Sequence, residues 1–154
     1  LKYLPKETAK NWEKRIKSSS DKINQNQKDF SDWVQKTTRE MHEYGIKFMA
    51  GTDTPLGFLI PGFSLHVELE LLVESGLSEL DAIKTATINP SKYFKMQDSL
   101  GQIKKNYIAD LILLNSNPLD DIKNTLEISA VIKNGEIYIN PLKIEWQLTA
   151  KMCF

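Results

Sequence analysis

The chain has 154 residues, of which 41% are hydrophobic, and its 20 basic residues balance 20 acidic ones, so its formal net charge is zero. A protein that binds nucleic acid or an anionic membrane normally shows a basic excess or stripe, so this balance argues against both partners. No apolar run reaches the roughly 18 residues that a membrane-spanning helix needs. The single cysteine, Cys153, excludes a disulfide framework and a thiolate metal site within one chain.

The first residue is Leu1, and the segment after it lacks the basic, apolar and small-residue regions of a signal peptide. We therefore expect the chain to be either processed or a piece of something longer, and we favour the second interpretation. The compartment stays open: cytoplasmic, or exported if a leader precedes Leu1. Self-association into a homo-oligomer also stays open.

Two helices and a strand are predicted in the first fifty residues. Apolar residues recur at helical spacing in residues 5–17 and 29–44, with charged residues on the other sides. Gly45 stands just past the second segment, where helices commonly end. Residues 46–50, IKFMA, follow directly and lack clean alternation, which predicts a strand buried on both faces, as in a parallel sheet.

Two further helices are predicted after a loop that is rich in glycine and proline. Ser64 is expected to cap the first of them. Ser78 and Asp81 have the spacing of a capping box, which predicts the start of the second. Asn89-Pro90 is expected to break that helix, because the residue before a proline is biased away from helical backbone angles.

The pattern changes from helical to strand-like near residues 97–101. Apolar residues alternate on both sides of Asn134-Gly135. This dipeptide predicts a two-residue hairpin turn, because a type I′ turn needs positive φ at both central positions. Val131 and Ile132 should lie on one strand, and Ile137 and Tyr138 on the other.

Four sequence blocks occur in a fixed order within about residues 46–139: AGTDTP, LHVELELLVESGLSELDAIKTATINPSKYF, LGQIKKNYIADLILLNSNPLDDI and VIKNGEIY. In this order and spacing, they resemble the C-terminal third of metal-dependent amidohydrolases. The similarity is greatest to the group around imidazolonepropionase and the prolidase-like dipeptidases. No single block is decisive, and the resemblance lies in their order and spacing.

The resemblance implies an α/β fold: the C-terminal part of a (β/α)8 barrel followed by the C-terminal strands of a small β-sandwich. Residues 1–97 would form the end of the barrel, with its last strand at about 46–50 and its closing helices at about 64–95. Residues 98–140 would form the sandwich portion, and residues 141–154 a tail.

The resemblance also implies an active site at Asp53, at the end of the last barrel strand. Amide hydrolysis near neutral pH needs an activated water and a polarised carbonyl, and a bound divalent metal supplies both. Asp53 would be both a metal ligand and the general base and acid, with Thr52 and Thr54 orienting it. Zinc is the expected metal. The expected substrates are small molecules, cyclic amides or small dipeptides.

The remaining ligands of such a site are missing from the chain. The family also needs a His-x-His pair and two further histidines, often with a carboxylated lysine. The chain has only His42 and His66, and neither matches a ligand position. His42 is expected on a helix surface. His66 is a candidate for substrate contact at the pocket mouth, beside the plainer interpretation of an exposed helix residue.

Two plainer interpretations stand beside this assignment. Glu68 and Glu70 are expected to be solvated positions on a packing helix, because residues two apart on a helix do not face each other. A non-catalytic binding or assembly module that retains part of the amidohydrolase fold fits the zero charge and the incomplete ligand set equally well. Asp53 would then be a turn or cap residue.

Overall fold

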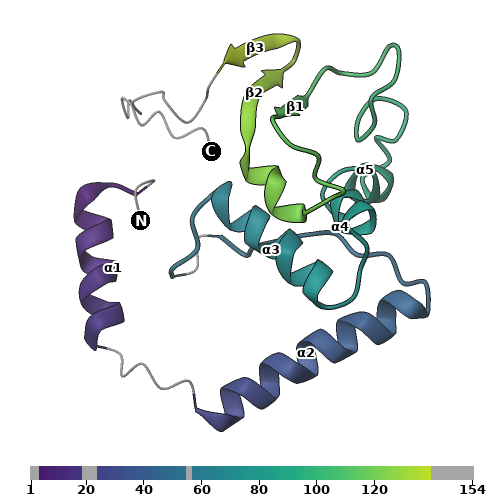
Figure 1. Cartoon of the computed structure of the whole chain (residues 1–154). Helices are drawn as coiled ribbons and strands as arrows, with labels where there is room; N and C mark the ends of the chain where they lie inside the picture. The colour runs from purple at the N-terminus through teal and green to yellow at the C-terminus, as the bar shows by residue number, and fades with distance from the viewer. Residues whose placement is uncertain (1–3, 19–23, 55–56, 140–154) are drawn as a thin grey trace.

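The computed structural model describes residues 4–18, 24–54 and 57–139, and within them five α-helices precede a three-stranded sheet. Figure 1 shows the three shortest helices grouped at the centre, with the sheet above them and the second helix below. The predicted tail at 141–154 lies outside the described residues. The elements in chain order are α1 (Lys6–Ser18), α2 (Gln25–Glu43), α3 (Phe63–Glu74), α4 (Glu79–Thr85), α5 (Ile88–Tyr93), β1 (Leu111–Leu114), the 3-10 helix η1 (Ile122–Leu126), β2 (Ile128–Lys133) and β3 (Glu136–Ile139).

The helix α2 begins at Gln25, earlier than the predicted residue 29, because a capping box precedes it. The Asn24 side-chain oxygen accepts from the Gln27 backbone N–H at 2.9 Å, and the Gln27 side-chain oxygen accepts from the Asn24 N–H at 3.0 Å. The helix ends as predicted, and Gly45 follows it at a φ of 80°. Its apolar stripe is largely solvent-facing, and Trp33 is 59% exposed.

Of the two serines predicted to cap helices, Ser78 does so and Ser64 does not. Gly62, with a φ of 77°, is the residue before α3, so the assignment of Ser64 as the cap is wrong. Ser64 instead lies inside the helix, buried, and its hydroxyl accepts from the Ile60 N–H at 2.8 Å. Ser78 caps α4 as predicted, since its hydroxyl accepts from the Asp81 N–H at 3.1 Å.

The helix α4 ends at Thr85, and Asn89-Pro90 lies in the first turn of α5. The prediction that this dipeptide ends the helix is therefore wrong, because α4 ends four residues before Asn89 and the dipeptide lies within the next helix. Proline is tolerated in a first turn because the N–H groups there have no partner within the helix.

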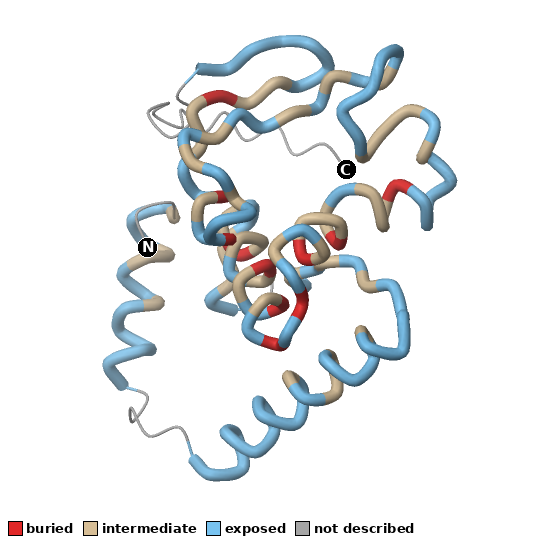
Figure 2. The backbone as a smooth tube through the Cα atoms, turned by 45° about the vertical axis from the view of Figure 1, so that its right-hand side comes forward, coloured by how far each residue is buried: buried red, intermediate tan, exposed pale blue. Residues whose placement is uncertain are grey.

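The hydrophobic core lies where α3, α4 and η1 meet. Figure 2 shows buried residues concentrated in this central region, whereas α1 and α2 carry none in their described parts. Ala82 is fully buried there. The core cluster comprises Leu69, Leu72, Leu77, Ala82 and Ile122, and Ala50 packs against it from the segment that precedes Asp53.

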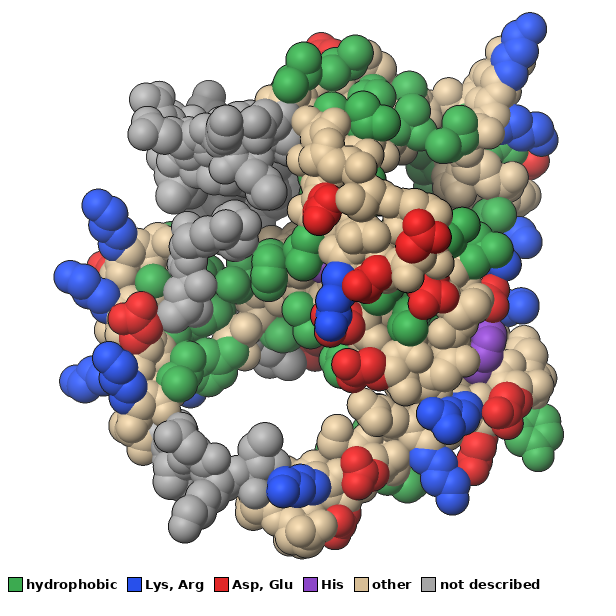
Figure 3. Space-filling model, viewed as in Figure 1, with side chains coloured by type: hydrophobic (Ala, Val, Ile, Leu, Met, Phe, Trp, Pro, Cys, Tyr) green, Lys and Arg blue, Asp and Glu red, His purple; other side chains and the backbone are tan. Residues whose placement is uncertain are grey.

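The sheet is antiparallel, in the order β1-β2-β3, and it contains the predicted hairpin. Asn134 and Gly135 have φ values of 52° and 84°, as a type I′ turn requires. The pairs Val131↔Tyr138 and Ile132↔Ile137 confirm the predicted register. Every residue of β3 is exposed, and Figure 3 shows apolar side chains gathered on this part of the surface.

The strand predicted at residues 46–50 is not formed among the described residues. Ile46 and Met49 are 46% and 44% exposed, so the expected burial on both faces is also absent. A strand needs the backbone of a neighbouring strand to form its ladder, and the described part of the chain offers none at this place. The mixed helix and strand content agrees with the α/β expectation. The division into barrel at 1–97 and sandwich at 98–140 remains a prediction.

None of the helices described here is both long and apolar enough to cross a membrane.

Candidate functional site

Asp53 lies in the irregular segment between α2 and α3, and its backbone has a φ of 51°. Most non-glycine residues lose roughly 1–2 kcal/mol in this left-handed region, and aspartate is among those that tolerate it. Asp53 is exposed, whereas the flanking Thr52 and Thr54 are half-buried. Their two hydroxyl oxygens lie 2.6 Å apart, within hydrogen-bond distance of each other. The loop therefore presents a carboxylate to solvent between two threonines that bind one another.

The segment that leads to Asp53 is held by α4 and α5. The Ala50 backbone N–H donates to the Thr85 carbonyl at 3.0 Å. The Asn89 side-chain amide donates to the Phe48 carbonyl at 2.8 Å. Because Thr85 is the last residue of α4 and Asn89 lies in the first turn of α5, the facing ends of these two helices fix the backbone three to five residues before Asp53.

Glu68 approaches the same segment from α3. It is half-buried, unlike the solvated position expected from the sequence. Burial raises the pKa of the Glu68 carboxyl above its ordinary value, and a hydrogen bond from the Gly51 backbone N–H partly opposes that shift. Glu68 thus contacts the backbone two residues before Asp53. Glu70 faces elsewhere, toward Lys123 at 3.0 Å.

His66 connects α3 to η1. Its Nδ1 lies 2.9 Å from the Thr125 hydroxyl, and that hydroxyl lies 2.8 Å from the Ile122 carbonyl, to which it donates. A threonine hydroxyl has one proton, so Thr125 must accept from His66, which places a proton on Nδ1. Burial lowers the pKa of His66, which favours the neutral ring. A neutral ring with its proton on Nδ1 leaves Nε2 as a hydrogen-bond acceptor.

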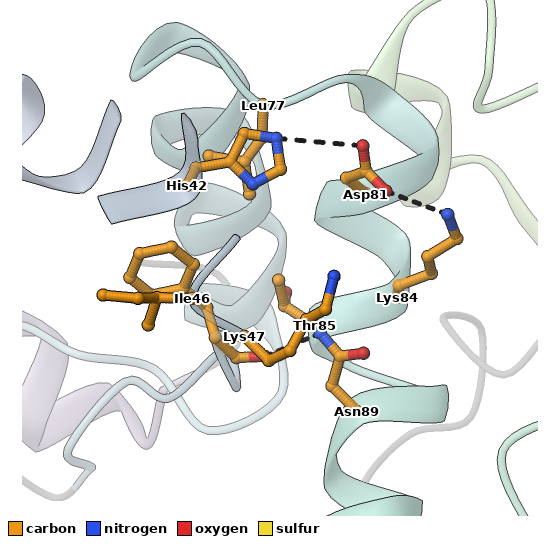
Figure 4. A pocket seen from close by; sticks show the side chains of 9 residues that line it. His42, Ile46, Lys47, Leu77, Asp81, Lys84, Thr85 and Asn89 are labelled. Atoms are coloured by element: carbon orange, nitrogen blue, oxygen red, sulfur yellow. Dashed lines mark hydrogen bonds and ion pairs between the residues drawn. The ribbon is translucent and has the colours of Figure 1, made fainter. Parts of the chain in front are cut away.

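A small pocket lies between α2, α4 and the segment around Lys47, shown in Figure 4. His42 lines it, with Nε2 at 3.9 Å from an Asp81 oxygen, so His42 is not simply a surface residue. The other Asp81 oxygen accepts from Lys84 Nζ at 2.9 Å. Hydrogen bonds from Lys84 and Ser78 lower the pKa of Asp81. The contact between His42 and Asp81 ties α2 to α4. Neither Asp53 nor His66 is among the residues that line this pocket.

A complete metal site is not formed by the described residues. They contain no group of three histidine, cysteine, aspartate or glutamate side chains that could hold an ion. His66 and His42 are engaged with Thr125 and Asp81, as described above. Catalytic zinc typically takes three protein ligands. Asp53 by itself does not fit that requirement.

Comparison with known proteins gives a match over most of the chain. The family described as "Amidohydrolase family" matches residues 7–138. Ochratoxinase from Aspergillus niger is 39% identical over 102 residues, covering 63% of this chain. Adenine deaminase from Listeria monocytogenes is 33% identical over 88 residues, covering 57% of this chain. The crystal structure of a Xaa-Pro dipeptidase with bound methionine superposes with a TM-score of 0.62 at 32% identity, covering 69% of this chain.

These matches cover a limited part of each relative. The chain spans 20% of the length of ochratoxinase, 14% of the adenine deaminase and 25% of the dipeptidase chain.

Proposed function

Because the chain belongs to the amidohydrolase family, we propose that it supplies Asp53 to the active site of a hydrolase that cleaves carbon–nitrogen bonds. The observation that carries this proposal is the setting of Asp53 itself. Asp53 has an exposed carboxylate and a left-handed backbone conformation. It follows directly a backbone segment that α4 and α5 fix by hydrogen bonds. Unusual backbone angles in well-held segments are typical of functional sites.

The proposed role of Asp53 is proton transfer. A carboxylate can accept the proton of an attacking water and then deliver it to the leaving nitrogen. We also propose that Asp53 is one ligand of a divalent metal, with zinc expected. The described residues do not form a metal site by themselves, so the other ligands would have to come from outside them.

His66 is proposed to contact the substrate through Nε2. With Nδ1–H directed to Thr125, Nε2 can accept a hydrogen bond from an N–H or O–H group. The neutral ring also avoids placing a positive charge in a half-buried position.

Small dipeptides and cyclic amides are the proposed substrates. Similarity to a Xaa-Pro dipeptidase supports the first class. The second class depends on the sequence resemblance to imidazolonepropionase. For the fold, we propose that residues 46–50 form the last strand of a (β/α)8 barrel in the intact protein and that residues 98–140 belong to a small β-sandwich.

The test replaces Asp53 by asparagine in the intact protein that contains this chain. Asp53→Asn keeps the shape of the side chain and removes its ability to accept a proton. The expected result is a loss of about 10²–10⁴-fold in kcat with an unchanged melting temperature. Asp32→Asn, on the exposed face of α2, is the matched control and should retain full activity. Turnover within about threefold of the parent in the Asp53→Asn variant would contradict the assignment.

A non-catalytic binding or assembly module is the second candidate, favoured by the absence of a three-ligand group among the described residues. The DNA that precedes the codon for Leu1 discriminates between the two. An in-frame His-x-His pair followed by two further spaced histidines favours the enzyme, and a start codon directly before Leu1 favours the module.

A further inference from the structure

We propose that Asn89 is a positioning residue for the reaction: it fixes the backbone that carries Asp53 and so sets the direction of the Asp53 carboxylate. This inference depends on the proposed function, because it gives Asn89 a role only through Asp53.

The hydrogen bonds around Met49 have the pattern of a parallel strand neighbour. In a parallel ladder, a residue on one strand makes two hydrogen bonds to the neighbouring strand. Its N–H donates to the carbonyl of the residue that precedes its partner, and its own carbonyl accepts from the N–H of the residue that follows its partner. Here the Asn89 amide donates to the Phe48 carbonyl at 2.8 Å, and the Thr85 carbonyl accepts from the Ala50 N–H at 3.0 Å. A side chain and a helix end therefore bind the segment as a strand would.

Asn89 is well suited to this contact. Its side chain is short, and it sits in the first turn of α5, directly before Pro90, where the backbone has little freedom. Figure 4 shows Asn89 close to Thr85 and to the segment at Lys47. The contact is part-buried, so solvent competes with it less than at the surface.

A displacement of the Phe48 backbone would displace Asp53, because the two residues are close in sequence. Phe48 is five residues before Asp53 in the same irregular segment. Without the Asn89 contact, the segment keeps only its contacts with Glu68 and with the Thr85 carbonyl among those described above. Displacement of a catalytic group by about 1 Å can reduce turnover by about 10²-fold.

The test compares three single variants of the intact protein and one double variant. Asn89→Asp keeps the side-chain shape but replaces the donating amide by a carboxylate. Asn124→Asp is the matched control, because the Asn124 amide also donates to a backbone carbonyl at 2.8 Å, that of Asn117 near η1. We expect Asn89→Asp to lower kcat by about 10–100-fold with KM within about threefold, and to speed hydrogen exchange of the amides in residues 46–54. Asn124→Asp should do neither.

The third variant, Asp53→Asn, separates the two proposals. If Asn89 acts through Asp53, adding Asn89→Asp to Asp53→Asn should lower the residual kcat by less than about threefold. A full 10–100-fold loss in that background would overturn the positioning role, as would an unchanged kcat in Asn89→Asp alone. If Asp53→Asn itself keeps parental turnover, the proposed function fails instead.

A second variant, Asn89→Ser, replaces Asn89→Asp in the test if the part-buried carboxylate prevents folding. Its side chain is uncharged and too short to replace the amide contact, so the same loss of kcat and faster exchange at residues 46–54 are expected. If both variants unfold at the assay temperature while Asn124→Asp does not, Asn89 is a residue of global stability and the inference is wrong.

Discussion

Replacing Gly101 by alanine should destabilise the protein through two effects that the structure separates. Gly101 has a φ of 84°, and a Cβ there would lie 2.7 Å from the Ser91 Cβ and 2.8 Å from the Thr87 carbonyl oxygen. The left-handed backbone costs alanine roughly 1–2 kcal/mol. Forcing a methyl group into a packed contact costs about 1–3 kcal/mol more. The expected loss in the free energy of unfolding is therefore about 2–5 kcal/mol.

Gly135→Ala is the control for the backbone effect alone. Gly135 has the same φ of 84°, but no heavy atom lies within 4 Å of its Cβ position. Its expected loss is roughly 1–2 kcal/mol. Urea unfolding of the parent and the two variants, compared by midpoint and slope, measures both values. Equal losses for Gly101→Ala and Gly135→Ala would refute the reasoning, because the contact with Ser91 would then contribute nothing.

Two further predictions concern His66 and the isolated chain. Burial lowers the folded-state pKa of His66 below 6.5, so the unfolded chain binds the proton more readily. The stability that the neutral ring contributes is therefore fully present above pH 6.5 and is lost as pH falls through the folded-state pKa. His66→Gln should flatten this part of the pH dependence in urea unfolding, and an unchanged profile would contradict the prediction. The 154-residue chain alone is expected to bind less than one zinc ion per chain and to hydrolyse no dipeptide or cyclic amide. A monomer with one tightly bound zinc ion and measurable turnover would overturn that expectation.

The features that local chemistry determines were predictable from the sequence. The Asn134-Gly135 turn and the pairing of Val131 with Tyr138 follow from positive φ and from alternation over a few residues. Ser78 as a helix cap has the same origin. In each case, the residues that interact are neighbours or are brought together by a two-residue turn.

The features that depend on distant partners were not predictable. The run at residues 46–50 has the composition of a buried strand, but its described partners are the Asn89 side chain and the end of α4. Asn89 was interpreted only as a helix breaker, because its partner Phe48 is 41 residues away. Ser64 failed as a cap because Gly62, with its positive φ, is the cap, and α3 therefore begins two residues earlier than it would with a cap at Ser64.

For the candidate site, the sequence pointed to Asp53 and His66 but not to the residues around them. The contact of His66 with Thr125 joins positions 59 residues apart, and no periodicity indicates it. Glu68 looked like one of two similar acidic residues on a helix. Only the packed structure distinguishes it from Glu70, since it alone of the two contacts Gly51.

The positive φ of Asp53 also limits which residues can replace it without damage to the backbone. Glycine, asparagine and aspartate are the residues that adopt this conformation most readily. Of these three, only aspartate carries a charge. A related sequence with asparagine or glycine at this position would therefore keep the loop and lose the carboxylate. Under the proposed role of Asp53, such a relative would retain the fold and lose the proton transfer, so the residue at this position is a simple marker to compare with measured activity across the family.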